Sequence, residues 1–377
     1  MKTEMKKLIY ADTFSKGAYH ETFNASSLKM FSEIYDEVTY ISTKSSRRVV
    51  ENILKGLPNN IKWHRIFLSS LKSCMGNFVR HSLSSFWNVL ILLLVPKDTT
   101  VFFNSNSLWF LSMINKIIRW RKINTIIMCH GEIEYIVTGQ RMNRFSVKGL
   151  RLFVNSHFKP AKTLHFCVLG KSIYQNLKGV VTDAVIDKTI YFEHTFIPRN
   201  SVTISPPDNI IRIGTIGTIR PEKGLEQIIQ FGKAIKPIAE MEFYALGKVI
   251  CDIKDLNAVN IKTIPGSDKE YIARDEFQSY IDKMDYLVFM YPTDKYKLTA
   301  SGALFDAIDS EKPILSLHND YFDTMFKRAN LGKQFDSLDE MICYIKNLGG
   351  KNILDIDFKE NKRKFSPEFE AKEQKFF

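Results

Sequence analysis

Short hydrophobic runs alternate with longer amphipathic segments along the whole chain. The runs are rich in β-branched and aromatic residues, which is typical of buried strands, and the longer segments have the apolar spacing of helices. Strands are expected at residues 7–11, 37–42, 61–67, 99–104, 124–129, 163–169 and 189–192, and then at 210–216, 241–246, 260–264, 286–290 and 313–316. Helices are expected near residues 20–34, 45–55, 69–94, 107–120, 140–152 and 171–178, and then near 223–236, 275–283, 302–310, 320–329 and 337–347.

This alternation predicts an α/β protein with two Rossmann-like, doubly wound parallel sheets, because strand–helix–strand units form right-handed parallel crossovers. A proline-containing polar stretch at 197–209 is typical of a linker. We therefore expect an N-terminal domain at 1–200, a second domain at 209–350 and a helical tail at 351–377 that packs back on the first domain. Ligands bind beyond the carboxyl ends of the strands in such sheets, so the site is expected in a cleft between the domains.

The net positive charge of the chain comes from its first half. Positions 1–200 contain 28 Lys and Arg residues against 13 Asp and Glu, whereas positions 201–377 contain 25 against 28. This asymmetry favours an anionic partner for the first half: acidic lipid headgroups, a pyrophosphate-bearing acceptor or nucleic acid. The alternative is a basic, solvated face without a specific partner, and we prefer an anionic membrane surface.

The stretch 62–95 mixes basic and aromatic residues. A helix of this composition can lie in the headgroup layer of a membrane, where a polyprenyl-linked acceptor would be presented. A core helix with its apolar face inward is the alternative for 86–95, which is about half the length of a spanning helix. The N-terminus lacks the apolar core of a signal peptide. We therefore expect a cytoplasmic protein, peripheral at the inner face of the cytoplasmic membrane.

The cysteines predict neither a metal site nor a disulfide framework. They are scattered, without a CxxC pair, at positions 74, 129, 167, 251 and 343. Both kinds of site need closer, patterned spacing. Reduced core cysteines are the simplest interpretation.

The turn at 217–224 is the first candidate site. A buried strand leads into Gly217, and Pro221 marks the first turn of the next helix. Glycine lets the backbone approach a ligand closely, and a helix N-terminus offers free amides to an anion. Arg220 and Lys223 add two cations. The turn therefore predicts a diphosphate site, and the alternative is an ordinary βα turn with surface cations.

The second candidate site follows the strand expected at 286–290. The loop leads through Ser301 and Gly302 into a helix, with Ser301 as the expected N-cap and the next amides placed to cradle a phosphate. Asp306 lies about one turn further on, where its carboxylate would accept hydrogen bonds from ribose hydroxyls. A solvated helical aspartate is the alternative.

The second half resembles the donor-binding domain of GT-B glycosyltransferases, in particular the family-4 enzymes (glycosyl transferases group 1) of bacterial surface polysaccharide biosynthesis. The family's G-R-L-x-x-x-K-G turn corresponds to 217–224, and its E-A-x-A-x-G-K-P element corresponds to the segment ending at Pro313. The resemblance covers roughly 210–330. It places Lys223 on the family's diphosphate-contacting lysine and Asp306 on the glutamate that holds the nucleotide ribose.

Two positions depart from the family pattern. Thr218 stands where the family's arginine usually stands, and Arg220 follows two residues later. Leu298 occupies the place of the first glutamate of the family's E-x7-E element, which is associated with retaining enzymes. The resemblance therefore does not fix the stereochemical outcome, and residues 299–302 are expected to supply backbone amides to the diphosphate instead.

In the first half, His130 follows the strand expected at 124–129. A histidine at a strand end that faces a cleft suits proton transfer or contact with a sugar, and related transferases often carry a histidine or aspartate there. His130 is therefore the first candidate for a catalytic or sugar-contacting role, with a structural histidine as the alternative. Glu132 is the second candidate, because an inverting enzyme needs a carboxylate or histidine base.

The loop after the first strand contains Gly17 and His20. The resemblance implies that this loop faces the cleft and contacts the acceptor or a phosphate. Ordinary loop chemistry is the alternative, and we favour it for His20. His194 lies near the domain junction and is not assigned.

Together these features predict a glycosyltransferase. It would move a hexose-type sugar from a UDP- or GDP-linked donor to a saccharide acceptor carried on a lipid, in the synthesis of capsule, O-antigen or exopolysaccharide. No cofactor is expected, and the absence of an Asp-x-Asp motif at the cleft positions predicts metal independence. The alternatives are a sugar-nucleotide epimerase of the same fold and a basic nucleic-acid-binding protein, although no nucleic-acid module is recognisable in the sequence.

Overall fold

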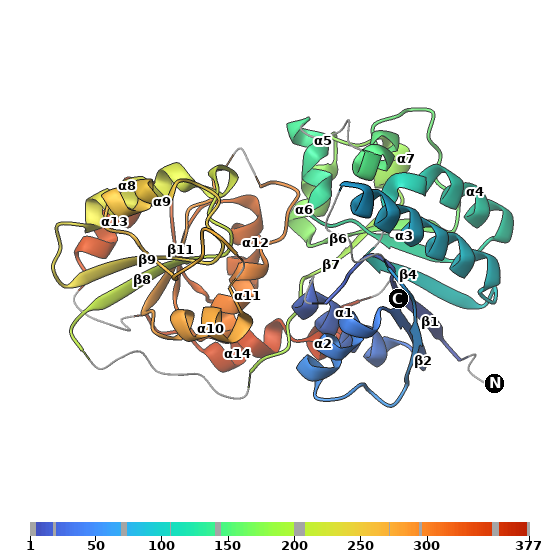
Figure 1. Ribbon diagram of the computed structural model, residues 1–377, viewed down its shortest axis with the longest axis horizontal. Coiled ribbons are helices and arrows are strands. Elements are labelled where there is room, and N and C mark those ends of the chain that lie inside the picture. The colour runs from blue at the N-terminus through green and yellow to red at the C-terminus, as the bar shows by residue number, and fades with distance from the viewer. Residues whose placement is uncertain are drawn as a thin grey trace. The chain divides into compact units, whose positions relative to one another are not determined.

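The computed structural model describes residues 5–17, 20–68, 74–105, 107–139, 145–199, 208–270, 272–293, 296–348 and 354–374. This part of the chain forms two compact units, each with its own parallel sheet and covering helices (Figure 1). Unit 1 comprises Met1–Ile197, Leu298–Ala300 and Phe365–Phe377. Unit 2 comprises Pro198–Lys297 and Ser301–Lys364.

The centre of unit 1 is a seven-stranded parallel sheet in the order β3-β2-β1-β4-β5-β6-β7. Its strands are β1 (Lys7–Asp12), β2 (Glu37–Ser42), β3 (Ile61–Arg65), β4 (Thr99–Ser105), β5 (Thr125–Met128), β6 (Leu164–Leu169) and β7 (Thr189–Phe192). The strand order reverses between β1 and β4, which makes this point the topological switch of a doubly wound fold. Ligands of such folds bind beyond the strand ends at this switch point.

Helices cover the sheet of unit 1. They are α1 (Glu21–Ile34), α2 (Lys44–Leu54), α3 (Cys74–Leu94), α4 (Leu111–Arg121), α5 (Glu134–Thr138), α6 (Lys171–Leu177), α7 (Asp183–Ile186) and α15 (Pro367–Glu373), with 3₁₀ turns η1 (Leu108–Phe110), η2 (Gly131–Ile133) and η3 (Phe145–Leu152). Helix α1 packs against α2 and α15, and α3 packs against α4. Buried rings of Tyr10, Phe31 and Phe102 fill the space between α1 and the sheet, with centroids 4.6–6.0 Å apart.

Unit 2 repeats this winding with a six-stranded parallel sheet in the order β10-β9-β8-β11-β12-β13. Its strands are β8 (Ile211–Ile216), β9 (Met241–Leu246), β10 (Lys262–Thr263), β11 (Tyr286–Phe289), β12 (Ile314–Leu317) and β13 (Gly332–Phe335). Its helical elements are η4 (Pro221–Lys223), α8 (Leu225–Ile235), α9 (Ile253–Ala258), α10 (Arg274–Asp282), α11 (Gly302–Asp309), α12 (Asp320–Arg328), α13 (Leu338–Lys346) and α14 (Phe358–Lys364). The switch point of this sheet lies between β8 and β11.

Arg199 fastens the beginning of unit 2 to its helices. Its guanidinium donates to Asp309 (2.8 Å) and with two nitrogens to Asp282 (3.0 and 3.1 Å). Both aspartates are buried. A planar guanidinium that binds a carboxylate through two parallel bonds fixes geometry as well as charge, so Arg199 holds α10 and α11 in a defined arrangement.

The α/β fold class with two doubly wound sheets, predicted from the sequence, is confirmed. All the expected strands are present, and no strand end differs from expectation by more than two residues. Strand β13 was not expected, because Lys333 and Gln334 interrupt its short apolar pattern. Part of the expected helix at 140–152 is the 3₁₀ turn η3, while residues 69–73, 140–144 and 200–207 lie outside the described residues.

The C-terminal tail differs from the single terminal helix that its charge pattern suggested. It forms two short helices, α14 and α15, which are separated at Phe365 and Ser366. Pro367 has no amide hydrogen to continue α14 and instead occupies the first turn of α15, where proline is favoured. Helix α14 packs on α11 within unit 2, and α15 packs on α1 within unit 1.

Candidate functional site

Two predicted donor segments adjoin each other at the switch point of unit 2. The turn 217–224 follows β8, and the loop that ends in α11 follows β11. A Cβ atom built on Gly217 would lie 3.5 Å from the Cβ of Ala303 and 3.6 Å from the Nζ of Lys223. The tertiary structure therefore brings the glycine turn, its lysine and the first turn of α11 to one place.

Glycine is required at Gly224 by both conformation and space. Its φ of +83° lies in the left-handed region that favours glycine. A Cβ there would lie 1.9 Å from the carbonyl oxygen of Met290, at the end of β11. Any larger residue would push the turn away from β11 and displace Lys223, which directly precedes Gly224.

The ammonium group of Lys223 is surrounded by aromatic rings. Its Nζ lies 5.5 Å from the ring centroid of Tyr291 and 5.3 Å from that of Tyr296. Burial opposes the charge, but the two tyrosines outweigh it, and the pKa of Lys223 is raised above its ordinary value. Among the described residues no carboxylate forms an ion pair with Lys223. A half-buried cation in this state is a ready partner for an anionic ligand.

Arg220 and Thr218 have weaker structural support than Lys223. The Nε of Arg220 lies 3.7 Å from a carboxylate oxygen of Glu222, and the guanidinium is 41% exposed. Thr218 is half-buried in the extended segment before Arg220. Pro221 begins the 3₁₀ turn η4, and the helix expected near 223–236 follows as α8 from Leu225.

Helix α11 begins after Ser301, as predicted, but the serine does not cap it through its side chain. The hydroxyl of Ser301 is buried and lies 3.3 Å from the hydroxyl of Tyr291. Gly302 is exposed, and a Cβ atom built on it would meet nothing within 4 Å. The start of α11 therefore has open space beside Gly302, and the first amides of a helix lack the carbonyl partners that later amides have.

The carboxylate of Asp306 is paired with Arg274, the first residue of α10, at 2.6 Å. Burial raises the pKa of Asp306, and the neighbouring guanidinium opposes this shift. Asp306 is thus held by a cation that the sequence did not bring to attention. Tyr291 and Tyr296 were missed in the same way, because single residues of common types carry no motif.

In unit 1, His130 lies at the end of β5, beside the end of β4. Its Nε2 lies 2.8 Å from the carbonyl oxygen of Asn104. Because a carbonyl oxygen can only accept, Nε2 carries the proton and Nδ1 is the basic nitrogen. The hydrogen bond therefore selects the tautomer that leaves Nδ1 without a proton.

Two rings from the start of α1 pack against the imidazole of His130. His20, the N-cap residue, stacks on it with a centroid distance of 4.6 Å and an interplanar angle of 13°. Phe23 contacts it edge-on at 5.2 Å, and also lies 5.3 Å from His194. Ordinary loop chemistry, favoured for His20 from the sequence, does not anticipate this stacking.

The two supporting histidines are neutral near neutral pH. Burial, followed by the positive field of the other imidazoles, lowers the pKa of His20 to about 3. Burial likewise lowers the pKa of His194 to about 3, with a smaller contribution from His130. His20 and His194 therefore surround His130 with uncharged rings.

A buried hydrogen-bond network lies beneath His130. Asn104, which receives the histidine proton on its carbonyl oxygen, donates its side-chain amide to Oδ1 of Asn24 at 2.7 Å. Asn24 in turn donates to Oδ2 of Asp12 at 3.1 Å, and Ser15 donates its backbone N–H to Oδ1 of Asp12 at 2.9 Å. Complete burial raises the pKa of Asp12 to about 6, opposed mainly by the bonds from Ser15.

Glu132 and Gly17 each have a hydrogen-bond partner within unit 1. The carboxylate of Glu132 accepts a hydrogen bond from the backbone N–H of His130 at 3.2 Å. Gly17 adopts φ +62° and donates its N–H to the hydroxyl of Ser45 at 3.2 Å. Neither contact requires a ligand, so both residues have local structural partners.

Residues 298–300 belong to unit 1 by their packing. Glu134 accepts hydrogen bonds from the backbone N–H of Leu298 (2.6 Å) and the hydroxyl of Thr299 (3.2 Å). The side chain of Leu298 is buried in the hydrophobic core of this unit. Leu298, which the resemblance aligns with the first glutamate of the E-x7-E element, is therefore an apolar anchor in this chain.

The described residues contain no cluster of three or more His, Cys, Asp or Glu side chains that could hold a metal ion. The described cysteines whose side chains are placed are free, and those at 129 and 167 are buried. Within the described part of the chain, no helix combines the length and apolar character needed to cross a bilayer.

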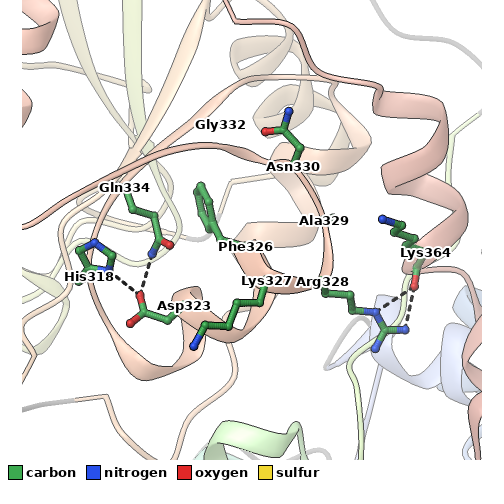
Figure 2. Close-up of a pocket in the computed structure, with 10 residues that line it drawn as sticks. All are labelled: His318, Asp323, Phe326, Lys327, Arg328, Ala329, Asn330, Gly332, Gln334 and Lys364. Carbon is green, nitrogen blue, oxygen red and sulfur yellow. Dashed lines mark hydrogen bonds and ion pairs between the residues drawn. The ribbon is translucent and has the colours of Figure 1, made fainter.

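A separate cavity of about 650 Å³ lies in unit 2 between α12, β13 and the end of α14. Figure 2 shows that three of its polar side chains, those of His318, Asp323 and Gln334, engage one another. Asp323 is bound by His318 (2.9 Å) and Gln334 (2.8 Å), and the guanidinium of Arg328 donates to the carbonyl oxygen of Lys364 (2.8 Å). None of the predicted site residues lines it, and we assign it no role in the chemistry.

Comparisons with known proteins bear on the fold. No protein-family profile matches the sequence, and no curated protein sequence matches it either. Solved structures, in contrast, are similar over nearly the whole chain. TarM superimposes with a TM-score of 0.60 at 9% identity, covering 99% of this chain and 97% of TarM.

Two further structures resemble the chain equally broadly. Anabaena HepE, in complex with UDP and glucose, has a TM-score of 0.57 at 12% identity and covers 98% of this chain and 94% of its own. The lipopolysaccharide outer core galactosyltransferase WaaB, in its apo form, has a TM-score of 0.57 at 12% identity, with coverage of 98% and 97%. The chain has the GT-B glycosyltransferase fold of these proteins.

Proposed function

We propose that this protein is a glycosyltransferase that moves a hexose-type sugar from a UDP- or GDP-linked donor to a lipid-linked saccharide acceptor in the synthesis of a surface polysaccharide. The fold supports this proposal, as does the likeness to a galactosyltransferase and to a protein bound to UDP and glucose. The observation that carries it is the ammonium of Lys223, which has no carboxylate partner among the described residues and lies beside the glycine turn at the switch point of unit 2.

In this proposal unit 2 binds the donor. Lys223, Arg220 and the free amides at Gly302 stabilise the negative charge that develops on the departing nucleotide diphosphate. Asp306, oriented by Arg274, receives the ribose hydroxyls on its remaining acceptor positions. Two cations and a helix N-terminus supply the charge that a divalent ion would otherwise provide, so we propose that transfer is metal-independent.

Unit 1 supplies the group nearest the chemistry of the acceptor. His130 has a protonated Nε2 fixed on the Asn104 carbonyl oxygen, which leaves Nδ1 to accept a proton or a hydrogen bond from a sugar hydroxyl. Glu132 is the second candidate for this role, although its carboxylate already receives the backbone N–H of His130. Gly17 and the loop around it are proposed to contact the acceptor.

The acceptor and its location follow from charge. Positions 1–200 carry 28 basic residues against 13 acidic ones, which favours a phosphate-bearing lipid carrier at an anionic membrane surface. We therefore place the reaction at the cytoplasmic face of a membrane, with residues 1–200 as the acceptor-binding domain and 209–350 as the nucleotide-sugar-binding domain. The tail at 351–377 adds one helix to each domain: α14 packs on α11, and α15 packs on α1.

The decisive experiment replaces Lys223 with methionine, which keeps the length of the side chain and removes its charge. Loss of one charge-assisted contact to a phosphate should weaken UDP or GDP binding and reduce sugar transfer by about 100-fold. Lys233→Met, on the exposed side of α8, is the matched control and should leave both unchanged. Calorimetric titration with UDP and GDP, and transfer assays with a panel of nucleotide sugars, measure the two effects.

Unchanged nucleotide binding in the Lys223→Met variant would remove the donor site and with it the proposal. The same panel separates transfer from epimerisation. Incubation with UDP-N-acetylglucosamine alone should return the unaltered sugar, whereas a new epimer formed without an acceptor would identify an epimerase instead.

A further inference from the structure

Helix α3 buries polar side chains in its middle and exposes large apolar ones. Its buried side chains include those of Ser84, Ser85 and Asn88 in the middle and of Ile91 and Leu92 near the end. The hydroxyl of Thr13 donates to the side-chain oxygen of Asn88 at 2.6 Å and lies 3.2 Å from the hydroxyl of Ser84. Polar contacts therefore hold the middle of this helix on its inner side.

The outer face of α3 is apolar. Met75, Phe78, Phe86 and Leu93 are exposed and lie on one side of the helix, with Ser82 between Phe78 and Phe86. Leu94, at the end of the helix, is 72% exposed. Large groups of exposed apolar side chains mark interaction surfaces in soluble proteins.

The end of α4 continues the same surface. Arg121 donates from its two terminal nitrogens to the carbonyl oxygens of Leu93 (2.5 Å) and Val95 (2.7 Å). This arginine ties the last turn of α4 to the last turn of α3. Trp120, its chain neighbour, is 72% exposed.

A loop before α3 adds an aromatic ring and a cation. The indole N–H of Trp87 donates to the carbonyl oxygen of Phe67 at 3.1 Å. Phe67 is exposed, and the guanidinium of Arg65 lies over its ring at 4.3 Å. We call the exposed apolar side chains of α3, Phe67 and Trp120, with the cations around them, the α3–α4 face.

The charge around this face selects its partner. Positions 74–122 contain six Lys and Arg residues and a single acidic residue, Asp98. A second copy of the chain docked through the same patch would place these cations opposite one another, and such like-charge juxtaposition is unfavourable. Apolar and aromatic side chains rimmed by lysine and arginine instead match the acyl boundary and the phosphates of an anionic bilayer.

We propose that the α3–α4 face is a lipid-docking surface whose apolar strip enters the interfacial layer of an anionic membrane. The proposal rests on the proposed function only for the lipid-linked nature of the acceptor. Its place in the fold is suited to that role, because the inner side of α3 contacts the loops that follow β1 and β4. Arg80 donates to the carbonyl oxygen of Phe14 (3.2 Å), and His81 lies 2.8 Å from the hydroxyl of Ser107.

Vesicle sedimentation tests the proposal with the full-length protein. Wild type should bind phosphatidylcholine vesicles that contain phosphatidylglycerol, and bind pure phosphatidylcholine vesicles weakly. The double variant Phe86→Ser, Leu94→Ser should lower binding to the anionic vesicles by about tenfold or more, since two apolar side chains no longer enter the layer. Ile250→Ser is the matched control, because Ile250 is equally exposed but lies in unit 2.

Lys116→Glu, on the exposed side of α4, should weaken binding further and make it less sensitive to salt. Unchanged vesicle binding by the double variant would overturn the proposal. So would a dimer in sedimentation analysis that the double variant dissociates, because the face would then join two copies of the chain.

The outcomes for this surface and for the proposed function are separable. The double variant should bind UDP and transfer sugar to a water-soluble saccharide acceptor as wild type does. If wild type binds UDP but not anionic vesicles, the docking surface fails and the transferase proposal remains. If it binds vesicles but neither UDP nor any nucleotide sugar, the transferase proposal fails and the docking surface remains.

Discussion

Replacing Asp12 with asparagine should change how the stability of unit 1 depends on pH. The ionised carboxylate can only accept hydrogen bonds, so Asn24 must donate its amide to Asp12 and present its oxygen to Asn104. An asparagine at position 12 supplies a donor where Asp12 had an acceptor. The side-chain amides of Asn24 and Asn104 must then each rotate by half a turn, so that their oxygen and nitrogen atoms exchange places. This rotation is feasible because Oδ1 of Asn104 has no hydrogen-bond partner in the present arrangement.

The magnitude follows from the pKa of Asp12, which burial raises from 3.8 to about 6. The folded state therefore holds a proton that the unfolded chain releases at lower pH. The stability linked to that proton is fully present below pH 3.8 and is lost as the pH rises through about 6. The loss amounts to about 3 kcal/mol at neutral pH, at about 1.4 kcal/mol for each pKa unit. Asparagine does not titrate and avoids this loss.

The free energy of unfolding of both proteins, measured by urea denaturation at about pH 4, 6 and 8, isolates this effect. The difference between Asp12→Asn and wild type should rise by about 2 to 3 kcal/mol in favour of the variant from the lowest to the highest pH, because a part of the effect already lies below about pH 4. His20 and His194 titrate in the opposite sense, but they are present in both proteins and cancel in the difference. Asp187→Asn, on the surface, is the control.

A difference that stays constant with pH would refute the reasoning, because Asp12 would then ionise alike in the folded and unfolded chains. Sugar transfer provides a second measurement. Since the network orients the carbonyl group that holds His130, the variant should lose turnover at neutral pH even where it gains stability. A variant with both higher stability and unchanged turnover would show that the network does not position His130.

Two further predictions concern single contacts. Arg199→Ala should destabilise unit 2 by about 3 kcal/mol, because it leaves two buried carboxylates uncompensated; Arg363→Ala, which removes an exposed pair, should change the denaturation midpoint little, and equal effects of the two variants would contradict this. In nitrogen-15 NMR spectra at neutral pH, His130 should carry its proton on Nε2, and a spectrum with the proton on Nδ1 would show that the Asn104 carbonyl oxygen does not select the tautomer.

The sequence was sufficient for most of the fold because the central strands of both sheets, such as β5 and β11, are buried on both faces. Such strands appear as continuous apolar runs, as in β1 and β5, and alternate with helices of clear periodicity. Strand β13 was missed because it lies at the edge of its sheet, where polar residues such as Lys333 are tolerated. The break between α14 and α15 was missed because the charge pattern of the tail continues through Pro367.

The sequence also indicated most of the candidate donor segment, since glycines and cations at 217–224 stand next to each other in the chain. The partners of these residues come from distant positions: Tyr291 and Tyr296 at Lys223, and Arg274 at Asp306. Such pairings leave no periodic trace, because each involves one side chain from an otherwise unremarkable loop or helix end.

Helix α3 shows the limit of periodicity most directly. Apolar residues occur around much of its circumference, so the pattern alone does not say which side faces the sheet. The hydroxyl of Thr13, at the end of β1, draws Ser84 and Asn88 inward and leaves Phe86 and Leu94 outside.

The sequence by itself determined which segments are strands and helices, how they are wound, and where the glycine turn and the basic half lie, because these depend on neighbours along the chain and on burial pattern. Only the tertiary structure decided which side of α3 is exposed, which nitrogen of His130 is basic, and that the rings of Tyr291 and Tyr296 lie beside Lys223. These depend on atoms that are distant in the chain and meet only after folding, where burial and hydrogen bonding set both charge and orientation.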